Sequence, residues 1–331
     1  MGERGVRIAE AEGSNPLPSI LKSTKKQSGK RWFLVAAALL AGAMLAFALS
    51  SARVTQAEDS PFNAARAGTD LAALVAFGPR PAGSAAIGQA RTYIVAELRK
   101  AGLEPVLDEF EAITPRGRKT MVNIRAARPG SQPKVIALAG HYDTKIFNFE
   151  FVGANDGGSS AAWLLEMARA TKDLKLSNTL EFLFFDGEEA VVEWTDTDSV
   201  YGSRHDVDRR YRAGDLSKLK ALILVDMIGD KDLNIRKESE STAWLKNLIW
   251  TRAQEMGFRR EFLNDEQAIA DDHVPYLKAG VNAVDLIDFD YPYWHTAGDT
   301  LDKTSGASLK IVGDVIYNVL PDVDKRVTAL P

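Results

Sequence analysis

Residues 135–141, VIALAGH, form an apolar run that ends on His141, and three later apolar runs end on carboxylates. These runs are LEFLFFDGEE at 180–189, LILVD at 222–226 and VNAVDLID at 281–288, and they end on Glu188 and Glu189, on Asp226, and on Asp285 and Asp288. Runs rich in Val, Ile, Leu and Phe without polar alternation are typical of strands buried on both faces, and therefore of a parallel sheet covered by helices. Open sheets of this type bind ligands beyond the carboxyl ends of their strands. The pattern therefore predicts one sheet edge that gathers imidazole and carboxylate groups, as a divalent metal site requires.

The segments around these runs predict the rest of the fold. Apolar residues at helical spacing predict helices at 70–78, 85–101, 159–171, 240–257 and 308–320, and Gly102 marks the end of the second. Residues 104–110 and 121–127 alternate loosely around a turn-rich TPRGRK, which favours an antiparallel hairpin at the edge of the sheet. We therefore predict an α/β sandwich with a central mixed, mainly parallel β-sheet flanked by helices, in one domain over residues 61–331.

An uncharged segment precedes this domain. Residues 32–49 carry no charge over 18 residues, and five cations stand upstream of them: Lys22, Lys25, Lys26, Lys30 and Arg31. The segment is just long enough to span a bilayer, and the cations favour a cytoplasmic N-terminus. We predict a disordered cytoplasmic tail (1–30), a transmembrane anchor (31–52), a linker (53–60) and a folded domain on the non-cytoplasmic side, periplasmic or extracellular. The alternative is a cleaved signal peptide, which would make the protein secreted.

Composition excludes several classes of function. The chain has 331 residues, of which 45% are hydrophobic and 26% charged, as in packed globular proteins. Of its 41 Lys and Arg, 8 lie in residues 1–57, as do 3 of its 45 Asp and Glu, so residues 58–331 hold 33 cations against 42 anions. This acidic balance argues against a nucleic-acid partner. No cysteine occurs, so disulfides and thiolate ligands are excluded and a metal must be held by His, Asp and Glu.

Candidate metal ligands stand at four places along the chain. His141 ends a strand in GHYDTK, Asp156 lies in the Gly-rich GANDGG before a helix, and His295 lies in YWHTAGDT. Glu188 and Glu189 follow a strand in FFDGEEA, where one carboxylate can bind metal while its neighbour transfers protons. Each place has a structural alternative: a core or capping histidine, a turn with a helix N-cap, or a solvated acidic turn. Their convergence on one sheet edge favours the metal site.

Two further acids are candidates for supporting roles in catalysis. Asp226 in LVDMIGD and Asp271 in ADDHVPYL could restrain the protonated form of Glu188 through short hydrogen bonds between carboxyl groups. Asp271 or Asp272 could equally cap the helix that starts near Val274.

The remaining candidates are aromatic. His273 is predicted to be structural and not a ligand. Trp294 stands beside His295, and Trp194 follows the paired glutamates, so both are candidates for apolar walls of a pocket. A tryptophan next to a ligand is otherwise usually part of a core.

Taken together and in this order, the segments resemble the glutaminyl cyclase family, which is related to the zinc aminopeptidases. The resemblance runs from about Phe77 to Leu320 and includes GHYDTK, GANDGG, FFDGEEA, LVDMIG, DDHVPYL and WHT. Its specific part is EEAVVEWTDTDSVYGSRH at 188–205, because GHYD, ND and EE are shared with the aminopeptidases. By this resemblance the fold is α/β with a central mixed sheet.

The resemblance also implies roles for individual residues. It implies one zinc ion per chain held by Asp156, Glu189 and His295, with Glu188 as the acid/base. It also implies that Asp226 and Asp271 support catalysis. The substrate pocket is implied to contain Trp194, Trp294, His141 and Asp285. The chain departs from the animal enzymes in lacking their disulfide and in carrying Asp285 where they have a pocket histidine, which leaves the electrostatics of the pocket open.

The activity implied is cyclisation of an N-terminal glutamine to pyroglutamate on peptides or proteins, with release of ammonia. Zinc would polarise the side-chain amide, and the substrate's own α-amine would attack it at high effective concentration. Glu188 would take a proton from the amine and return it to the leaving nitrogen. We expect a monomer that binds peptide or protein substrates with N-terminal Gln and contacts the membrane through its N-terminal helix.

Two other functions fit the same residues. A zinc aminopeptidase with one or two metals would use His141 and Asp226 for a second site, with Asp156 bridging. The paired tryptophans and the YGSRH segment favour the cyclase, because they suit a narrow pocket that excludes bulk water. The third possibility is a membrane-anchored receptor domain that kept the fold but lost catalysis.

Overall fold

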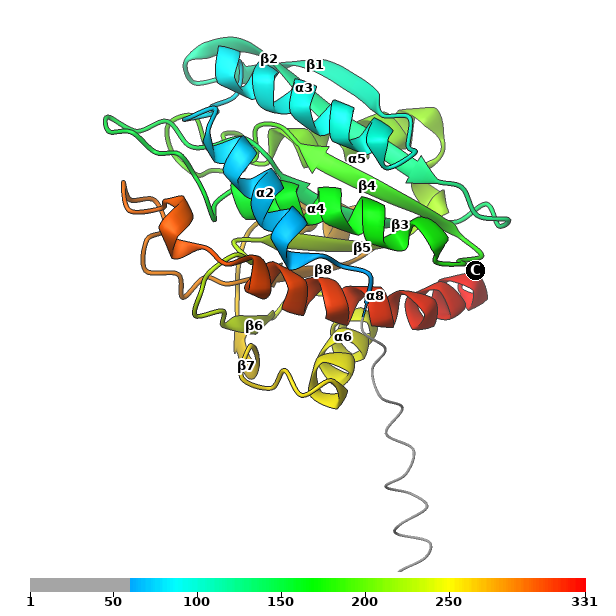
Figure 1. The fold of residues 1–331 in the computed structure, drawn as a ribbon. Coiled ribbons are helices and arrows are strands. Elements are labelled where there is room, and N and C mark those ends of the chain that lie inside the picture. The colour runs from blue at the N-terminus through cyan, green and yellow to red at the C-terminus, as the bar shows by residue number, and fades with distance from the viewer. Residues whose placement is uncertain (1–59) are drawn as a thin grey trace, which may run out of the picture. The chain divides into compact units, whose positions relative to one another are not determined.

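The computed structural model describes residues 60–331 (Figure 1). The predicted tail (1–30), the predicted anchor (31–52) and nearly all of the predicted linker (53–60) lie outside the described residues. Within residues 60–331, no helix has both the length and the apolar character needed to cross a membrane.

A six-stranded mixed sheet forms the centre of the described chain, with the strand order β1, β2, β4, β3, β5, β8. The strands are β1 (Val106–Thr114), β2 (Gly117–Arg128), β3 (Val135–His141), β4 (Thr179–Phe185), β5 (Leu219–Asp226) and β8 (Asn282–Ile287). The first three in this order pair antiparallel, and β4, β3, β5 and β8 run parallel. The predicted central mixed sheet is confirmed, and the four apolar runs are its parallel strands.

The parallel strands are buried because helices cover both faces of the sheet. Along β3, Ile136 and Leu138 belong to the larger of two cores, whereas Ala137 and Ala139 belong to the smaller one. The helices on the larger core are α2 (Ala64–Val75), α3 (Ala85–Lys100), α4 (Gly158–Ala170), α6 (Ala243–Glu255) and α8 (Gly306–Ala329). On the smaller core lie α5 (Tyr201–Ala213) and α7 (His273–Lys278). Figure 1 shows α2, α3, α4 and α8 in front of the sheet.

The predicted helices are present, with shifted ends. The second ends at Lys100, and Gly102 has a φ of 78°, which fits its predicted role as a stop. The first begins earlier than predicted because the side chain of Asn63 accepts a hydrogen bond from the amide of Arg66 and caps it. The last continues past residue 320 because Val323 and Val327 extend its buried stripe.

Helix α5 was absent from the predicted elements because its buried face is charged. Arg210 donates to Asp206 at 2.6 Å and also pairs with Glu181 of β4. The hydroxyl of Tyr276 on α7 donates to the same aspartate at 2.7 Å. A helix buried through ion pairs shows no apolar period, so a search for apolar spacing does not detect it.

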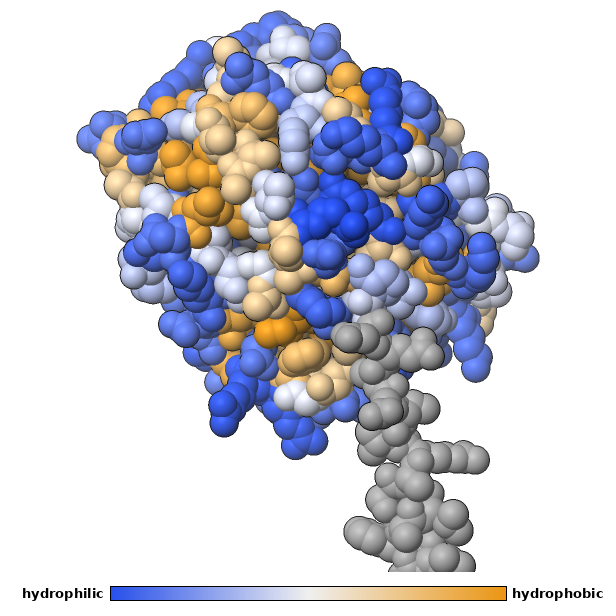
Figure 2. All heavy atoms as spheres, viewed as in Figure 1, coloured by the Kyte–Doolittle hydropathy of each residue, from blue (hydrophilic) through white to orange (hydrophobic). Residues whose placement is uncertain are grey.

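Smaller elements complete the described chain. A two-stranded parallel sheet of β6 (Ile235–Glu238) and β7 (Phe262–Gln267) was not predicted. Three short 3₁₀ helices are η1 (Thr171–Asp173), η2 (Leu216–Lys218) and η3 (Leu301–Lys303). Figure 2 shows the face seen in Figure 1, where hydrophilic side chains are interspersed with apolar groups, as is usual for an exposed protein surface.

Candidate active site

The parallel strands deliver polar side chains to one edge of the sheet. His141 is the last residue of β3 and Asp226 the last of β5, while Glu188 and Glu189 follow the end of β4. These three strands are neighbours in the order β4, β3, β5. Residues that lie far apart in the sequence therefore meet at the carboxyl ends of the parallel strands, the sheet edge that the sequence pattern predicts.

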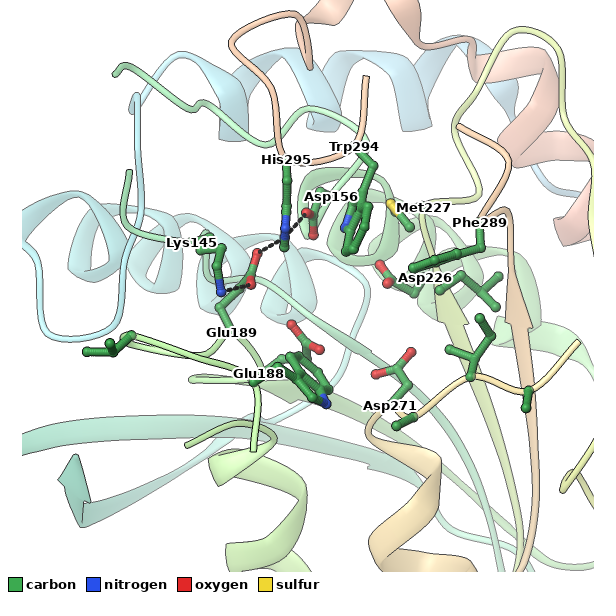
Figure 3. A pocket seen from close by; sticks show the side chains of 16 residues that line it. Lys145, Asp156, Glu188, Glu189, Asp226, Met227, Asp271, Phe289, Trp294 and His295 are labelled. Atoms are coloured by element: carbon green, nitrogen blue, oxygen red, sulfur yellow. Dashed lines mark ion pairs between the residues drawn. The ribbon is translucent and has the colours of Figure 1, made fainter. Parts of the chain in front are cut away.

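Asp156, Glu189 and His295 form the first of two groups that could hold a metal ion. The Nε2 atom of His295 lies 3.4 Å from Asp156 Oδ2 and 3.4 Å from Glu189 Oε1. Figure 3 shows the three side chains converging, with Lys145 on the other side of Glu189. The Nζ atom of Lys145 lies 3.6 Å from Glu189 Oε2. The three residues for which the resemblance implied metal binding thus come together, from three separate loops.

His141, Asp156 and Asp226 form the second group. The Nε2 atom of His141 lies 3.1 Å from Asp226 Oδ1 and 3.3 Å from Asp156 Oδ1. Asp156 therefore belongs to both groups and turns one oxygen toward each histidine. This is the arrangement expected of a carboxylate that could bridge two metal ions.

The first group has the donor set and the unsatisfied atoms that a zinc ion requires. Two carboxylates and one imidazole leave a fourth position open, as in catalytic zinc sites. Within residues 60–331, Asp156 Oδ2 and Glu189 Oε1 are buried and make no hydrogen bond. Burial, followed by the charge of Asp156, raises the pKa of Glu189 to about 7. Burying two carboxylate oxygens that face each other costs free energy unless a cation balances their negative charge. The residues therefore fit a zinc ion.

The loop that carries Asp156 is held from the opposite side by Asp299. Its carboxylate accepts hydrogen bonds from the amides of Asn155 and Asp156, at 2.8 and 3.1 Å, and from the hydroxyl of Tyr291. The amides before α4 thus bind the carboxylate of Asp299 and not that of Asp156. The side chain of Asp156 can therefore face the two histidines.

Gly157, the N-cap residue of α4, is required by the same loop. Its φ is 79°, and a Cβ atom there would lie 2.3 Å from the carbonyl oxygen of Asp143. We expect Gly157→Ala to destabilise the protein by about 2–4 kcal/mol, from backbone strain and overlap together. Gly78→Ala is the matched control, because Gly78 has a φ of 76° with nothing within 4 Å of the added atom. Urea unfolding of both variants measures the difference, and equal losses would contradict the role of the close approach.

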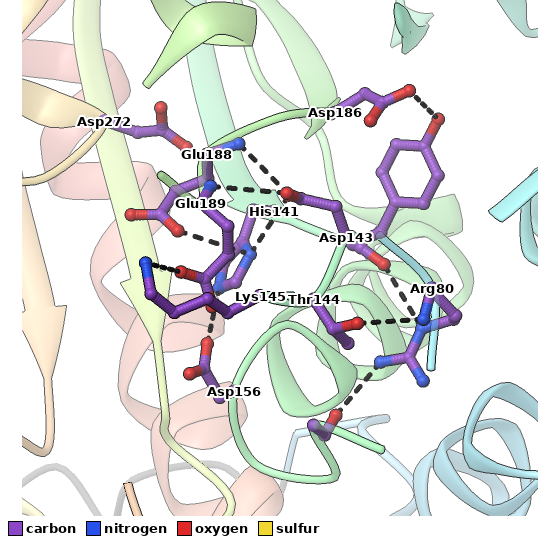
Figure 4. Close-up of polar contacts among 12 residues, drawn as sticks. Arg80, His141, Asp143, Thr144, Lys145, Asp156, Asp186, Glu188, Glu189 and Asp272 are labelled. Atoms are coloured by element: carbon purple, nitrogen blue, oxygen red, sulfur yellow. Dashed lines mark hydrogen bonds and ion pairs between the residues drawn. The ribbon is translucent and has the colours of Figure 1, made fainter. Parts of the chain in front are cut away.

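Asp143 binds the backbone of the turn that carries Glu188 and Glu189, the glutamate turn. Its Oδ1 and Oδ2 atoms accept hydrogen bonds from the amides of Glu188 at 3.1 Å and Glu189 at 3.3 Å, and its Oδ1 lies 3.4 Å from His141 Nδ1 (Figure 4). The aspartate therefore couples the end of β3 to the turn after β4. Sequence reasoning gave no role to Asp143 or Asp299, because neither ends an apolar run.

Glu188 is buried against this cluster. Burial raises its pKa well above the usual value, with further contributions from the charges of Glu189 and Asp271, although His141 opposes the shift. Its Oε2 atom lies 3.7 Å from His141 Nδ1. A carboxyl group with a raised pKa in such a position suits proton transfer.

The predicted hydrogen bonds from Asp226 and Asp271 to Glu188 are not formed within the described chain. Asp226 instead contacts His141, and Asp271 accepts a hydrogen bond from the amide of Asp272 at 2.5 Å. Asp272 is the N-cap residue of α7, as the capping alternative allowed, but its side chain accepts from Ser203 and makes no cap hydrogen bond. Both Asp226 and Asp271 nevertheless line the same cavity as Glu188.

A cavity of about 430 Å³ opens onto these groups. Trp194 and Trp294 line it, as predicted for the pocket walls, and both are partly exposed, at 40% and 39%. Apolar residues complete the lining: Val192, Met227, Ala268, Ile269, Ala270, Ile287 and Phe289. The cavity therefore combines a polar floor with largely apolar walls, as small-molecule sites commonly do.

Two residues predicted for the pocket do not line it. His141 lies behind the carboxylates, 2% exposed, where it contacts Asp143, Asp156 and Asp226. Asp285 lies inside β8, two residues before the strand ends, and its fully buried side chain lies beside His273 on one face of the sheet and not at the sheet edge.

His273 lies outside both metal groups. It is fully buried, with its Nε2 atom 3.3 Å from Glu238 Oε2 and its Nδ1 atom 3.7 Å from Asp285 Oδ2.

The chain is similar to a known protein family and to individual proteins. A model of the peptidase family M28 matches residues 123–320. The glutaminyl-peptide cyclotransferase of Drosophila melanogaster is 31% identical over 249 residues, which cover 67% of this chain and 70% of that protein.

Two solved structures have the same fold. A glutaminyl cyclase from an Acidobacteriales bacterium is 38% identical with a TM-score of 0.76, covering 81% of this chain and 98% of that one. A Zn-dependent exopeptidase from Parabacteroides distasonis is 26% identical with a TM-score of 0.73, covering 79% and 98%. The chain therefore belongs to peptidase family M28 and, within it, to the glutaminyl cyclases that are related to zinc aminopeptidases.

Proposed function

We propose that this chain is a zinc-dependent glutaminyl-peptide cyclotransferase, which converts an N-terminal glutamine to pyroglutamate and releases ammonia. The observation that carries the proposal is the joint placement of Asp156, Glu189, His295 and Glu188 on a cavity walled by two tryptophans. The similarity to glutaminyl cyclases from a fly and a bacterium supports it.

The residues divide the reaction between them. A zinc ion held by Asp156, Glu189 and His295 would supply a Lewis acid for the carbonyl oxygen of the glutamine side chain. Glu188 accepts a proton from the α-amine as the bond forms between the α-nitrogen and the side-chain carbonyl carbon. It returns the proton to the side-chain amide nitrogen as the bond between that nitrogen and the carbonyl carbon breaks. Ammonia leaves, and the ring keeps the former α-nitrogen. The attacking amine is part of the substrate, so no water needs to be bound for the attack.

The apolar walls favour this outcome over hydrolysis. Trp194 and Trp294 line the cavity with large apolar rings, together with Val192, Ile269 and Phe289. Exclusion of bulk water protects the amide from competing attack and strengthens the electrostatic interactions at the cavity floor.

A peptide assay with the full-length chain tests the proposal. The chain is incubated with zinc and a peptide that begins with Gln, and a second peptide with an acetylated N-terminus serves as the control. We expect one ammonia released for each peptide that becomes blocked at its N-terminus, and no reaction of the control. Release of free glutamine would instead support an aminopeptidase.

The aminopeptidase is the second candidate because Asp156 turns its two oxygens to two histidines. His141 and Asp226 would then hold a second metal ion. Counting bound metal separates a cyclase with one zinc ion from an aminopeptidase with two metal ions.

We further propose that residues 31–52 attach the chain to a membrane, with the catalytic domain on the non-cytoplasmic side. The support is the uncharged segment and the upstream cations. Protease digestion of cells stripped of any outer membrane tests this placement, since only a cytoplasmic domain would then be protected. The monomeric state stays a prediction.

A further inference from the structure

The imidazole ring of His295 has an unusual support. Its Nε2 atom faces Asp156 and Glu189, so its Nδ1 atom points away from them. A histidine that binds metal almost always donates its other ring N–H to a carboxylate or carbonyl, which fixes the ring. Within residues 60–331, Nδ1 of His295 has no such hydrogen-bond partner in the protein.

The backbone does not replace this missing support. His295 has a φ of 55°, in the left-handed region that costs an ordinary residue about 1 kcal/mol or more. It lies in the turn after β8, between Trp294 and Thr296, outside any helix or strand.

Aromatic rings surround the imidazole instead. Trp294 stacks on it at 4.2 Å between centroids with an interplanar angle of 22°, and the two side chains lie next to each other in Figure 3. Phe147 packs against it at 5.3 Å and 67°, and Phe151 at 6.0 Å and 86°. Phe147 and Phe151 also contact each other, at 5.1 Å. The imidazole, whose side chain is 21% exposed, therefore packs against three rings that come from two loops.

The loop that carries Phe147 is anchored at both ends by Arg80. The amide of Arg80 donates to Thr144 Oγ1 at 2.8 Å, and its guanidinium donates to the carbonyl oxygens of Val152 at 2.8 Å and Gly153 at 3.0 Å. Figure 4 shows Arg80 beside Thr144. Arg80 is 1% exposed, so these contacts are shielded from water. An anchored loop can hold Phe147 in place as a wall.

We propose that Phe147 is a positioning residue that fixes the imidazole of His295 for metal binding, in place of a hydrogen bond to Nδ1. Phe147 packs edge-on against the imidazole while Trp294 stacks on it, and the two contacts together restrict rotation of the imidazole about the bond between Cβ and the ring. The inference rests on the proposed metal site and adds a residue that touches neither the metal nor the substrate.

Neighbouring phenylalanines supply a matched control. Phe149 stacks on Phe147 at 4.7 Å and is 39% exposed, but it makes no ring contact with His295. Removing the ring at 149 therefore alters the same loop without touching the ligand. Phe147→Leu keeps apolar bulk beside the imidazole and tests whether packing is the cause.

Zinc affinity of the full-length chain, measured by competition with a chromophoric chelator, tests the proposal. We expect Phe147→Ala to weaken zinc binding about 10-fold or more, the effect typical of losing an outer-shell partner. Phe147→Leu should recover most of this loss, and Phe149→Ala should stay within about 2-fold of the unchanged chain. Thermal unfolding of the metal-free variants checks that each is folded.

A second measurement needs no metal. The chain has four histidines, so the imidazole signals in a nitrogen-15 NMR spectrum can be assigned by substitution. We expect the His295 signal of the metal-free Phe147→Ala variant to broaden or shift, and that of Phe149→Ala to stay unchanged.

Two results would overturn the inference: unchanged zinc affinity in Phe147→Ala, or an equal loss in Phe149→Ala. Failure of the unsubstituted chain to bind zinc would refute the proposed metal site itself, which is a distinct outcome.

Discussion

Glu188→Gln is expected to stop turnover while the metal site stays loaded. A glutamine has nearly the same shape as the glutamate but cannot accept the proton of the attacking amine. Loss of a general acid/base typically lowers kcat by about 10²–10⁴-fold. Glu188 is outside the group of Asp156, Glu189 and His295, so zinc binding should change little. Ammonia release and zinc content, measured on the same samples, check both expectations.

Glu193→Gln is the matched control for this variant. Glu193 lies in the same connection between β4 and α5 but is exposed, and it does not line the cavity. It should keep the activity of the unchanged chain. If Glu188→Gln also kept that activity, another group would have to carry the proton, and the assignment of Glu188 would be wrong.

The sheet was predictable because its strands are buried on both faces. A strand such as β3 has to be apolar at every position, and the run ends abruptly at His141 where the chain reaches the edge. The rule that an apolar run ends at the sheet edge also located Asp226 and the glutamate turn. It failed at Asp285, because a buried acid inside β8 looks in the sequence like an acid at the strand's end.

The loops were less predictable because polar contacts across long separations leave no local pattern. The carboxylate of Asp299 binds the amide of Asp156, which is 143 residues away in the sequence. The carboxylate of Asp143 binds the amide of Glu188, which is 45 residues away. His295 could be connected with Asp156 and Glu189 only through the resemblance to a family. Nothing in the spacing of IFNFEF indicated that Phe147 would pack on a ligand.

Asp156→Asn is expected to have the largest effect on metal binding. Asp156 is the one residue shared by both groups, and its two oxygens face His141 and His295. Loss of an outer-shell partner alone costs about 10–100-fold in metal affinity, so loss of a charged direct ligand should cost more than about 100-fold. Cyclase activity should fall with the bound zinc.

The variant Asp226→Asn distinguishes a site that holds one metal ion from a site that holds two. Asp226 contacts His141 at 3.1 Å and belongs only to the second group. In a cyclase with one zinc per chain, this variant should keep its full zinc content, because Asp156, Glu189 and His295 are unchanged. In a two-metal aminopeptidase, the unchanged chain would hold two ions and the variant would lose one of them. Elemental analysis after dialysis gives both counts, and a fall from two ions to one would replace the cyclase with the peptidase as the function of this site.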